Sequence, residues 1–196
     1  MNKIKQLLLI TTLSISVISL PVSADAASYK VQKGDSFWSI ANEYGVPVLS
    51  LLNENNRTGS LLYAGETINI PHAPVSQAEK ELMAKLVNAE AKGEPYAGKV
   101  AVATVVLNRV DHNEFPNTIK EVIYERSNGH YAFSPVQNGA INDGFSNEDM
   151  KAVNEAIAFQ GQGNGSLYFY NPETAQSSWI KTRETTKTIG NHVFAK

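Results

Sequence analysis

Residues 82–110 read LMAKLVNAEAKGEPYAGKVAVATVVLNRV, and this stretch determines how the larger part of the chain folds. Its first half places Met83 and Leu86 on one apolar stripe at helical spacing, and Gly93 ends that helix. The residues from 98 to 110 are apolar on nearly every side, which is typical of a helix at the centre of a domain. The stretch therefore predicts two consecutive helices, the second of them buried.

Further signals extend this pattern to the C-terminus. Residues 118–121 (TIKE) and 146–149 (SNED) each fit a capping box, which predicts helices ending near residues 125 and 160. Residues 167–170 and 192–195 resemble short strands, separated by the polar stretch 171–186. The second half of the chain is thus predicted to be an α+β domain, mainly helical, with a minor β-sheet.

A second compact unit is predicted upstream, over residues 29–71. Its two ends alternate like strands, whereas Asp35 or Ser36 can cap a first helix and residues 48–53 indicate a second one. The predicted order is βααβ. We expect Trp38 to fill the core, because so small a domain needs its large apolar side chains inside.

This unit resembles the LysM family. It has the pattern Val-x-x-Gly-Asp-Ser-x-Trp-x-Ile-Ala, a central Asn and a closing Gly-x-x-Ile-x-Ile-Pro. The resemblance implies binding of polymers that contain N-acetylglucosamine, peptidoglycan or chitin, in a shallow groove between two loops. The groove residues that it implies are Gly34, Asp35 and Ser36 on one side and Leu61, Leu62 and Tyr63 on the other.

The N-terminus predicts export. Lys3 and Lys5 precede an apolar run over residues 7–20, which ends in small residues with an Ala-x-Ala-like site. The run is shorter than the roughly 20 residues that a membrane-spanning helix needs. We therefore expect a signal peptide over 1–26 and a mature protein that is exported or held on a wall, with no membrane span after cleavage. The predicted boundaries are 27–72 for the LysM domain, 73–77 for a linker and 78–196 for the second domain.

Composition excludes several classes of protein. The 196 residues include no cysteine, which rules out disulfide scaffolds, thiolate zinc sites and cysteine nucleophiles. The formal net charge of −2 disfavours a nucleic-acid partner, which would need a basic face. The four histidines lack the paired spacing of a metal helix. We expect a monomer with no cofactor and no bound metal.

Glu90 is the strongest candidate for chemistry. It lies seven residues after Met83 and four after Leu86, so it continues the apolar stripe at the end of its helix. Partial burial and the negative end of the helix dipole both disfavour the ionised form, which should raise the pKa of Glu90. Such a carboxyl suits a general acid. For Glu94 we expect only a favourable charge in the first turn of the next helix.

Several blocks of the second half resemble the spore cortex-lytic, SleB/CwlJ-type cell-wall hydrolase family. They are residues 87–103, 106–110, 133–136, 167–172 and 189–194. The resemblance covers residues 78–196 and implies a lysozyme-like fold that cuts the glycan strand of peptidoglycan. It also implies that the first Glu of the Ala-Glu-Ala-x-Gly-Glu block, here Glu90, is the catalytic acid.

The carboxylates favour one mechanism. Four further candidates lie in loops, none in a recognisable motif with Glu90: Glu94, Asp111, Asp143 and Glu173. A single glutamate suffices if it protonates the leaving oxygen and then, as carboxylate, takes the proton of the muramic acid 6-hydroxyl. This reaction, lytic transglycosylation, leaves a 1,6-anhydro ring and is our first hypothesis. The substrate cleft is expected to use Phe133, Gln137, Tyr168, Tyr170, Asn171 and Trp179.

Alternatives remain open. A true muramidase would use a second carboxylate, and an N-acetylmuramoyl-L-alanine amidase would need three zinc ligands. A different class is a wall or spore-coat protein that binds through its LysM unit without catalysis. Asn108 and Arg109, at the end of the central helix, are expected to satisfy either its last carbonyls or a buried loop.

Overall fold

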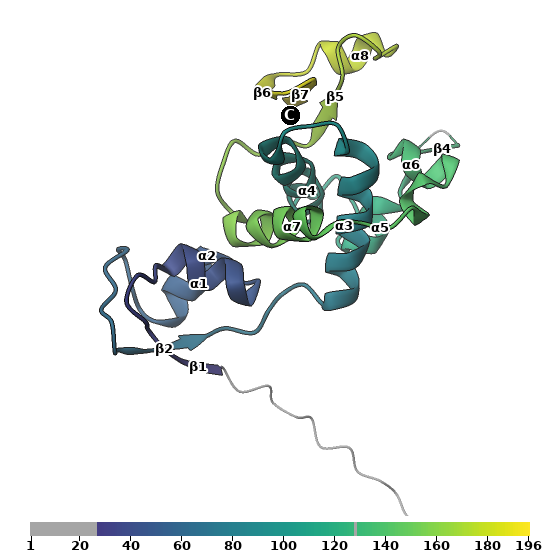
Figure 1. Cartoon of the computed structure of the whole chain (residues 1–196). Helices are drawn as coiled ribbons and strands as arrows, with labels where there is room; N and C mark the ends of the chain where they lie inside the picture. Colours follow the sequence, from purple (N-terminus) through teal and green to yellow (C-terminus); the bar gives the residue numbers. More distant parts are fainter. Residues whose placement is uncertain (1–26, 128) are drawn as a thin grey trace, which may run out of the picture.

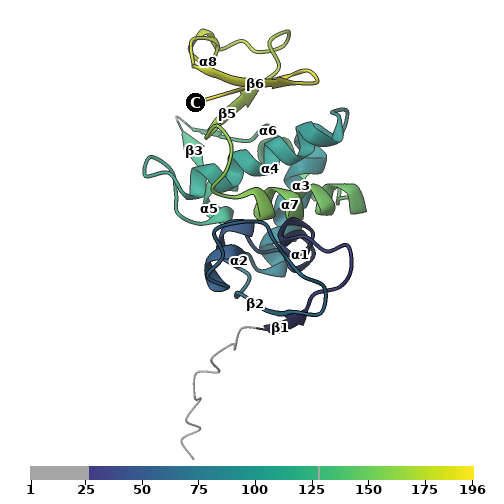
Figure 2. The same cartoon turned by 90° about the vertical axis from the view of Figure 1, so that its left-hand side faces the viewer.

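The computed structural model describes residues 27–127 and 129–196. The predicted signal peptide over residues 1–26 lies outside these described residues. The molecule has three tiers: the N-terminal unit, a layer of helices and a small sheet that carries the C-terminus (Figure 1). A view turned by 90° shows the same order of tiers (Figure 2). No helix in the described part of the chain is long and apolar enough to cross a membrane.

The N-terminal unit has the predicted βααβ order. It consists of β1 (Ala27–Lys30), α1 (Phe37–Tyr44), α2 (Val48–Glu54) and β2 (Thr67–Ile70). The two strands pair antiparallel. Ser36 is the N-cap of α1, because its side chain accepts a hydrogen bond from the Ser39 N–H and the Ser39 hydroxyl accepts one from the Ser36 N–H.

The expectation that Trp38 fills the core of this unit is wrong. Phe37 is only 2% exposed, whereas Trp38 is 37% exposed. In α1 the core face passes through Phe37, Ile40 and Ala41, and Trp38 lies about 100° away from Phe37 around the helix. Its ring instead contacts the Phe159 ring of the helical layer edge-on, with centroids 6.3 Å apart.

Three long helices form the middle tier. They are α3 (Gln77–Ala91), α4 (Tyr96–Val110) and α7 (Asn147–Phe159), and each packs against the other two. Ser146 caps α7 as predicted. The short helix α5 (Ile119–Ile123) begins after the Thr118 cap and ends two residues before the expected position. The completely buried residues of the core include Met83, Leu86, Val102, Val106 and Ile157.

Small elements complete this tier. The strands β3 (Arg126–Ser127) and β4 (His130–Tyr131) pair as a hairpin, followed by α6 (Ser134–Asn138) and the 3-10 helix η1 (Ala140–Asn142). None of these elements was predictable from the sequence, because elements of two to five residues carry too little periodicity.

The third tier is a sheet with strand order β5-β7-β6. It contains β5 (Tyr168–Tyr170), β6 (Thr185–Ile189) and β7 (His192–Ala195), paired antiparallel, and α8 (Ser178–Lys181) precedes β6. The polar stretch over 171–186, expected to separate the two predicted strands, contains α8 and the start of β6, neither of which was predicted. β6 is an edge strand with few apolar residues, Thr-Thr-Lys-Thr-Ile, so it lacks the alternation that identifies a half-buried strand. The α+β class with a minor sheet is confirmed.

Candidate active site

The side chain of Glu90 lines a cavity of about 350 Å³. This cavity lies between the C-terminal ends of α3 and α4 on one side and strands β5 and β7 on the other. Glu90 lies in the last turn of α3, and the segment from β4 to α6 forms another wall. The lining residues are Glu90, Arg109, Tyr131, Ala132, Phe133, Ser134, Phe169, Tyr170, Asn171, Thr174 and His192.

The carboxyl group of Glu90 is held in a protonatable state. Burial raises the pKa of Glu90 to about 7, and the positive charge of Arg109 acts in the opposite direction. The direction is the one expected from its place on the apolar stripe, since Met83 and Leu86 on that stripe are fully buried. A carboxyl with a pKa near neutrality can give up a proton and take one back.

Arg109 is a buried cation in the wall of this cavity. Its side chain is 6% exposed, and its Nε donates a hydrogen bond to the Leu167 carbonyl at 2.8 Å. The guanidinium carbon lies 4.9 Å from the ring centroids of both Phe115 and Phe133 and 5.6 Å from that of Tyr168. Burial lowers the pKa of Arg109. Such stacked contacts stabilise a desolvated guanidinium.

Asn108, next to Arg109, holds the same segment of chain before β5. Its Nδ2 donates to the Ser166 carbonyl at 2.9 Å, one residue before the carbonyl that Arg109 holds. Of the two expectations for this pair, satisfaction of a buried loop is therefore correct. The end of α4 fixes the chain that enters β5, and β5 carries Tyr170 to the cavity.

Glu94 has a different role from the one expected. Its Oε2 accepts a hydrogen bond from the Asn191 N–H at 2.9 Å, and its Oε1 accepts one from the Asn191 amide at 3.1 Å. The first turn of α4 contains no acidic residue, so the expected favourable charge in that turn is wrong. Glu94 ties the α3–α4 turn to the β6–β7 turn, where Gly190 adopts a φ of +56°.

His192 also lines the cavity, although nothing in its sequence context predicts a role for it. It is buried, its Nδ1 has no hydrogen-bond partner within the described structure, and its ring lies 5.2 Å from that of Phe169. Burial lowers the pKa of His192 and so favours the neutral imidazole, while the nearby charge of Glu94 acts in the opposite direction. Arg109, Tyr131 and Thr174 were missed as well, because nothing in their spacing marks them.

The structure brings together four of the seven residues proposed for the active site. Phe133, Tyr170 and Asn171 line the cavity with Glu90. The other three do not line it: Gln137 is exposed on α6, Trp179 is 53% exposed on α8, and Tyr168 packs edge-on against Trp179 at 5.2 Å.

Glu90 is the only carboxylate among the described residues that line this cavity. Asp111 accepts a hydrogen bond from Gln160 at 2.9 Å, and Glu94 is held by Asn191. Asp143 and Glu173 are exposed outside it. Across residues 27–127 and 129–196, no group of three His, Asp or Glu side chains is placed to hold a metal ion.

The proposed LysM groove residues occupy two loops. Asp35 Oδ2 accepts hydrogen bonds from the Tyr29 hydroxyl at 2.8 Å and from the Gln32 N–H at 2.7 Å. The bond between Tyr29 and Asp35 raises the pKa of Tyr29 to about 12. Gly34 needs its flexibility, with a φ of +100°, and Ser36 is occupied as the α1 cap. In the second loop, Leu61 and Tyr63 are 62% and 59% exposed, while Leu62 packs against the core.

Comparison with known proteins gives two family matches. The family described as Cell Wall Hydrolase matches residues 93–195, and the LysM domain matches residues 29–71. Glu90 lies three residues before the Cell Wall Hydrolase match begins.

Curated relatives and solved structures agree with these matches. The chain is 37% identical to the spore cortex-lytic enzyme of Oceanobacillus iheyensis, over 85% of this chain and 59% of that one. It is 44% identical to the Bacillus cereus spore cortex-lytic enzyme, over 65% of this chain and 48% of that one. The chain thus spans about half to three fifths of the length of these relatives. The catalytic domain of the germination-specific lytic transglycosylase SleB from Bacillus anthracis superposes with a TM-score of 0.58 at 43% identity, covering 64% of this chain and 100% of that one.

Proposed function

The chain belongs to the cell wall hydrolase family, and from this premise we propose that it cleaves the MurNAc–GlcNAc strand of peptidoglycan as a lytic transglycosylase. The observation that carries the proposal is Glu90, a carboxyl with a pKa of about 7 that is the only carboxylate among the described residues lining its cavity. The similar solved structure from Bacillus anthracis, which is described as a lytic transglycosylase, supports the same reaction.

The reaction uses one carboxyl twice. Protonated Glu90 donates its proton to the glycosidic oxygen as the bond between that oxygen and C1 of the muramic acid breaks. The resulting Glu90 carboxylate then takes the proton of the 6-hydroxyl, and that oxygen bonds to C1. The product end is 1,6-anhydro-MurNAc, the other product carries the first proton, and no water is consumed.

Cavity residues have supporting roles in this proposal. Arg109 stabilises the transient Glu90 carboxylate between the two proton transfers, because an adjacent cation favours the charged form. Phe133, Tyr170 and Asn171 contact the sugars next to the scissile bond. Gln137, Tyr168 and Trp179 contact the substrate further from it.

The N-terminal unit anchors the enzyme to the same polymer. The proposed groove uses Gly34, Asp35 and Ser36 together with Leu61, Leu62 and Tyr63, of which Leu61 and Tyr63 are exposed and Leu62 packs against the core. The proposal places a monomeric protein, secreted after cleavage of residues 1–26, in the wall or the spore cortex. The curated relatives named spore cortex-lytic enzymes support that location.

Mass spectrometry of released muropeptides tests the proposal. The purified protein should release 1,6-anhydro ends, about 18 Da lighter than reducing ends because no water is added, from spore cortex, vegetative sacculi or both. Glu90→Gln should release none. Reducing ends would indicate a muramidase and freed peptides an amidase. Absence of any product would favour a wall-binding protein without catalysis.

A further inference from the structure

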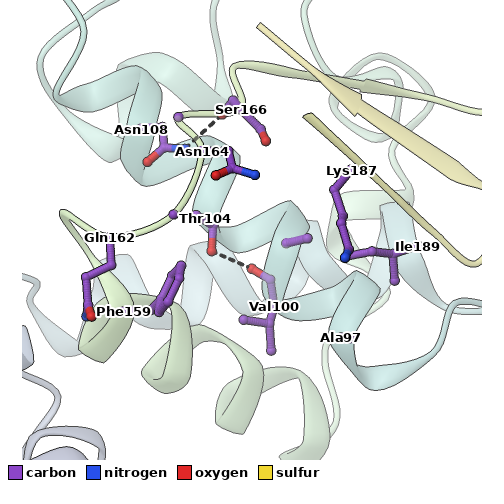
Figure 3. A pocket seen from close by; sticks show the side chains of 13 residues that line it. Ala97, Val100, Thr104, Asn108, Phe159, Gln162, Asn164, Ser166, Lys187 and Ile189 are labelled. Carbon is purple, nitrogen blue, oxygen red and sulfur yellow. Dashed lines mark hydrogen bonds between the residues drawn. The ribbon is translucent and has the colours of Figure 1, made fainter. Parts of the chain in front are cut away.

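A second cavity, of about 290 Å³, lies apart from the Glu90 cavity. It is formed by one face of α4, the end of α7, the loop over residues 162–166 and strand β6 (Figure 3). None of its lining residues also lines the Glu90 cavity. It is therefore a separate feature of the same domain.

Its walls combine apolar and polar groups. Val100 and Ala101 of α4, Phe159 of α7 and Ile189 of β6 supply apolar surface. Asn108 and Asn164 supply amides, and Asn108 Oδ1 remains free to accept because its Nδ2 is the atom bonded to Ser166. A few polar groups in an apolar hollow are typical of a ligand site.

A β-bulge aims a cation at this cavity. Thr185 pairs with Ala195 and Lys187 pairs with Phe194, so Thr186 is an extra residue in β6. The bulge is held by cavity residues: the Thr186 and Ser166 hydroxyl oxygens lie 2.6 Å apart, and the Asn164 amide donates to the Thr186 carbonyl at 3.4 Å. Bulges re-aim side chains and are frequent next to sites. Figure 3 shows Lys187 and Asn164 over the hollow.

The loop that holds the bulge contributes two glycines to the cavity wall, Gly163 and Gly165. Their φ angles are +91° and +68°, a conformation that favours glycine. A Cβ at Gly165 would meet no atom within 4 Å, whereas one at Gly163 would lie 2.8 Å from the Phe159 ring. At Gly165 the wall therefore consists of backbone alone, so a peptide can approach it closely.

Charge sets the orientation of a ligand. Lys187 is the only charged residue among the described residues of the cavity wall, and no ion pair involves it in the described part of the chain. A neighbouring hollow contains Asp111 and His112, and the two hollows adjoin, since both are lined by Asn108, Gln162, Gly163 and Gly165. The groove formed by these two adjoining hollows has a cation, Lys187, in the first and a carboxylate, Asp111, in the second.

We propose that this groove binds the peptide stem of peptidoglycan, with a stem carboxylate at Lys187 and a stem ammonium group at Asp111. A short peptide with small alanine side chains and both charges matches the apolar floor, the amides and the polarity of the groove, whereas a neutral sugar leaves both charges unused. The substrate polymer rests on the proposed function. The groove would add recognition of the peptide to recognition of the glycan.

The test is a titration of the isotope-labelled protein, followed by NMR, with two probes: a free stem tetrapeptide and a neutral GlcNAc–GlcNAc disaccharide. The tetrapeptide should shift the amide signals of residues 162–166 and 185–189. Lys187→Gln should raise the Kd for the tetrapeptide about tenfold, because one charge-assisted contact is lost. Added salt should also weaken binding of the tetrapeptide to the parent protein. Lys187→Arg should retain binding, and so should Lys151→Gln, which removes an exposed lysine of α7. Asp111→Asn should also weaken binding.

Tetrapeptide binding that is absent, or equal in Lys187→Gln, overturns the proposal, and so do shifts at these residues with the disaccharide alone. The Lys187→Arg result separates loss of charge from loss of folding. Binding is measured without turnover, so failure here is distinct from failure of the proposed reaction, which would appear as full lytic activity in Glu90→Gln.

Discussion

Two glutamates on either side of the α3–α4 turn, Glu90 and Glu94, lie in opposite environments. On one side, Glu90 opens into a cavity, and burial raises its pKa to about 7 without any hydrogen bond contributing. On the other side, both carboxylate oxygens of Glu94 accept hydrogen bonds from Asn191. Four residues of separation thus divide a reactive carboxyl from a structural one, because catalysis needs a group whose charge is not already stabilised.

The largest expected effect is on turnover. Glu90→Gln should reduce wall lysis by about a thousandfold or more, because it removes the only proton donor of the proposed reaction. Glu94→Gln keeps one acceptor for Asn191 and should stay within a few-fold of the parent. The measurement is the initial rate of turbidity loss of purified sacculi. Equal losses of lytic activity in the two variants would show that Glu90 and Glu94 do not have different roles.

The second effect is on stability and depends on pH. The pKa of Glu90 is raised from 4.5 to about 7 on folding, so the folded state binds the proton more tightly and loses stability as pH rises through that window. At about 1.4 kcal/mol per pKa unit, the full loss is about 3 kcal/mol. Glu90→Gln should remove this dependence, so it should stabilise the protein at pH 8 relative to the parent and much less at pH 5. Urea unfolding at both pH values measures the difference, and a variant that is less stable at pH 8 would contradict it.

A third change probes Glu94 through its neighbour. Gly190 has a φ of +56°, and a Cβ there would contact the Glu94 carboxylate and lie 2.7 Å from Pro95 Cδ. Gly190→Ala should cost about 1–3 kcal/mol of unfolding free energy. Gly165→Ala is the matched control, because its φ of +68° is similar but its Cβ would meet nothing within 4 Å. Thermal unfolding of both variants should show the larger loss for Gly190→Ala.

The smallest effect is a displacement of the pH profile. The charged and titratable groups around Glu90 are Arg109 of α4 and His192 of β7, with Tyr131 and Tyr170 in the same wall. Arg109→Gln removes the charge that lowers the pKa of Glu90, so the fall of kcat/KM at alkaline pH should move to higher pH. Arg57→Gln, in the N-terminal unit, should leave the profile unchanged. A shift to lower pH in Arg109→Gln would show that Arg109 acts on Glu90 in another way.

Sequence alone predicted those features of the fold and of the site that depend on residues close together in the chain. The stripe through Met83 and Leu86 predicted α3 and the inward position of Glu90, and the Ser146 capping box predicted the start of α7. Residues close in sequence determine these features, so periodicity and capping suffice.

The rest depends on contacts between distant residues. Arg109 reaches Leu167 across 58 positions, and Glu94 reaches Asn191 across 97. Neither pair has a local signature, so the cation beside Glu90 and the structural role of Glu94 were not predictable. Trp38 was misplaced for a related reason, since its partner Phe159 belongs to another tier of the molecule.

The most direct test of Glu90 as a single acid and base is to treat the glycan products with sodium borodeuteride before mass spectrometry. Reducing MurNAc ends take up deuterium as they become alditols, whereas 1,6-anhydro ends have no free aldehyde and do not react. Lytic transglycosylation by Glu90 should give unlabelled MurNAc ends about 18 Da lighter than reducing ends. Deuterium at these ends would show that water attacked C1, and Glu90 would then not be the group that performs both proton transfers.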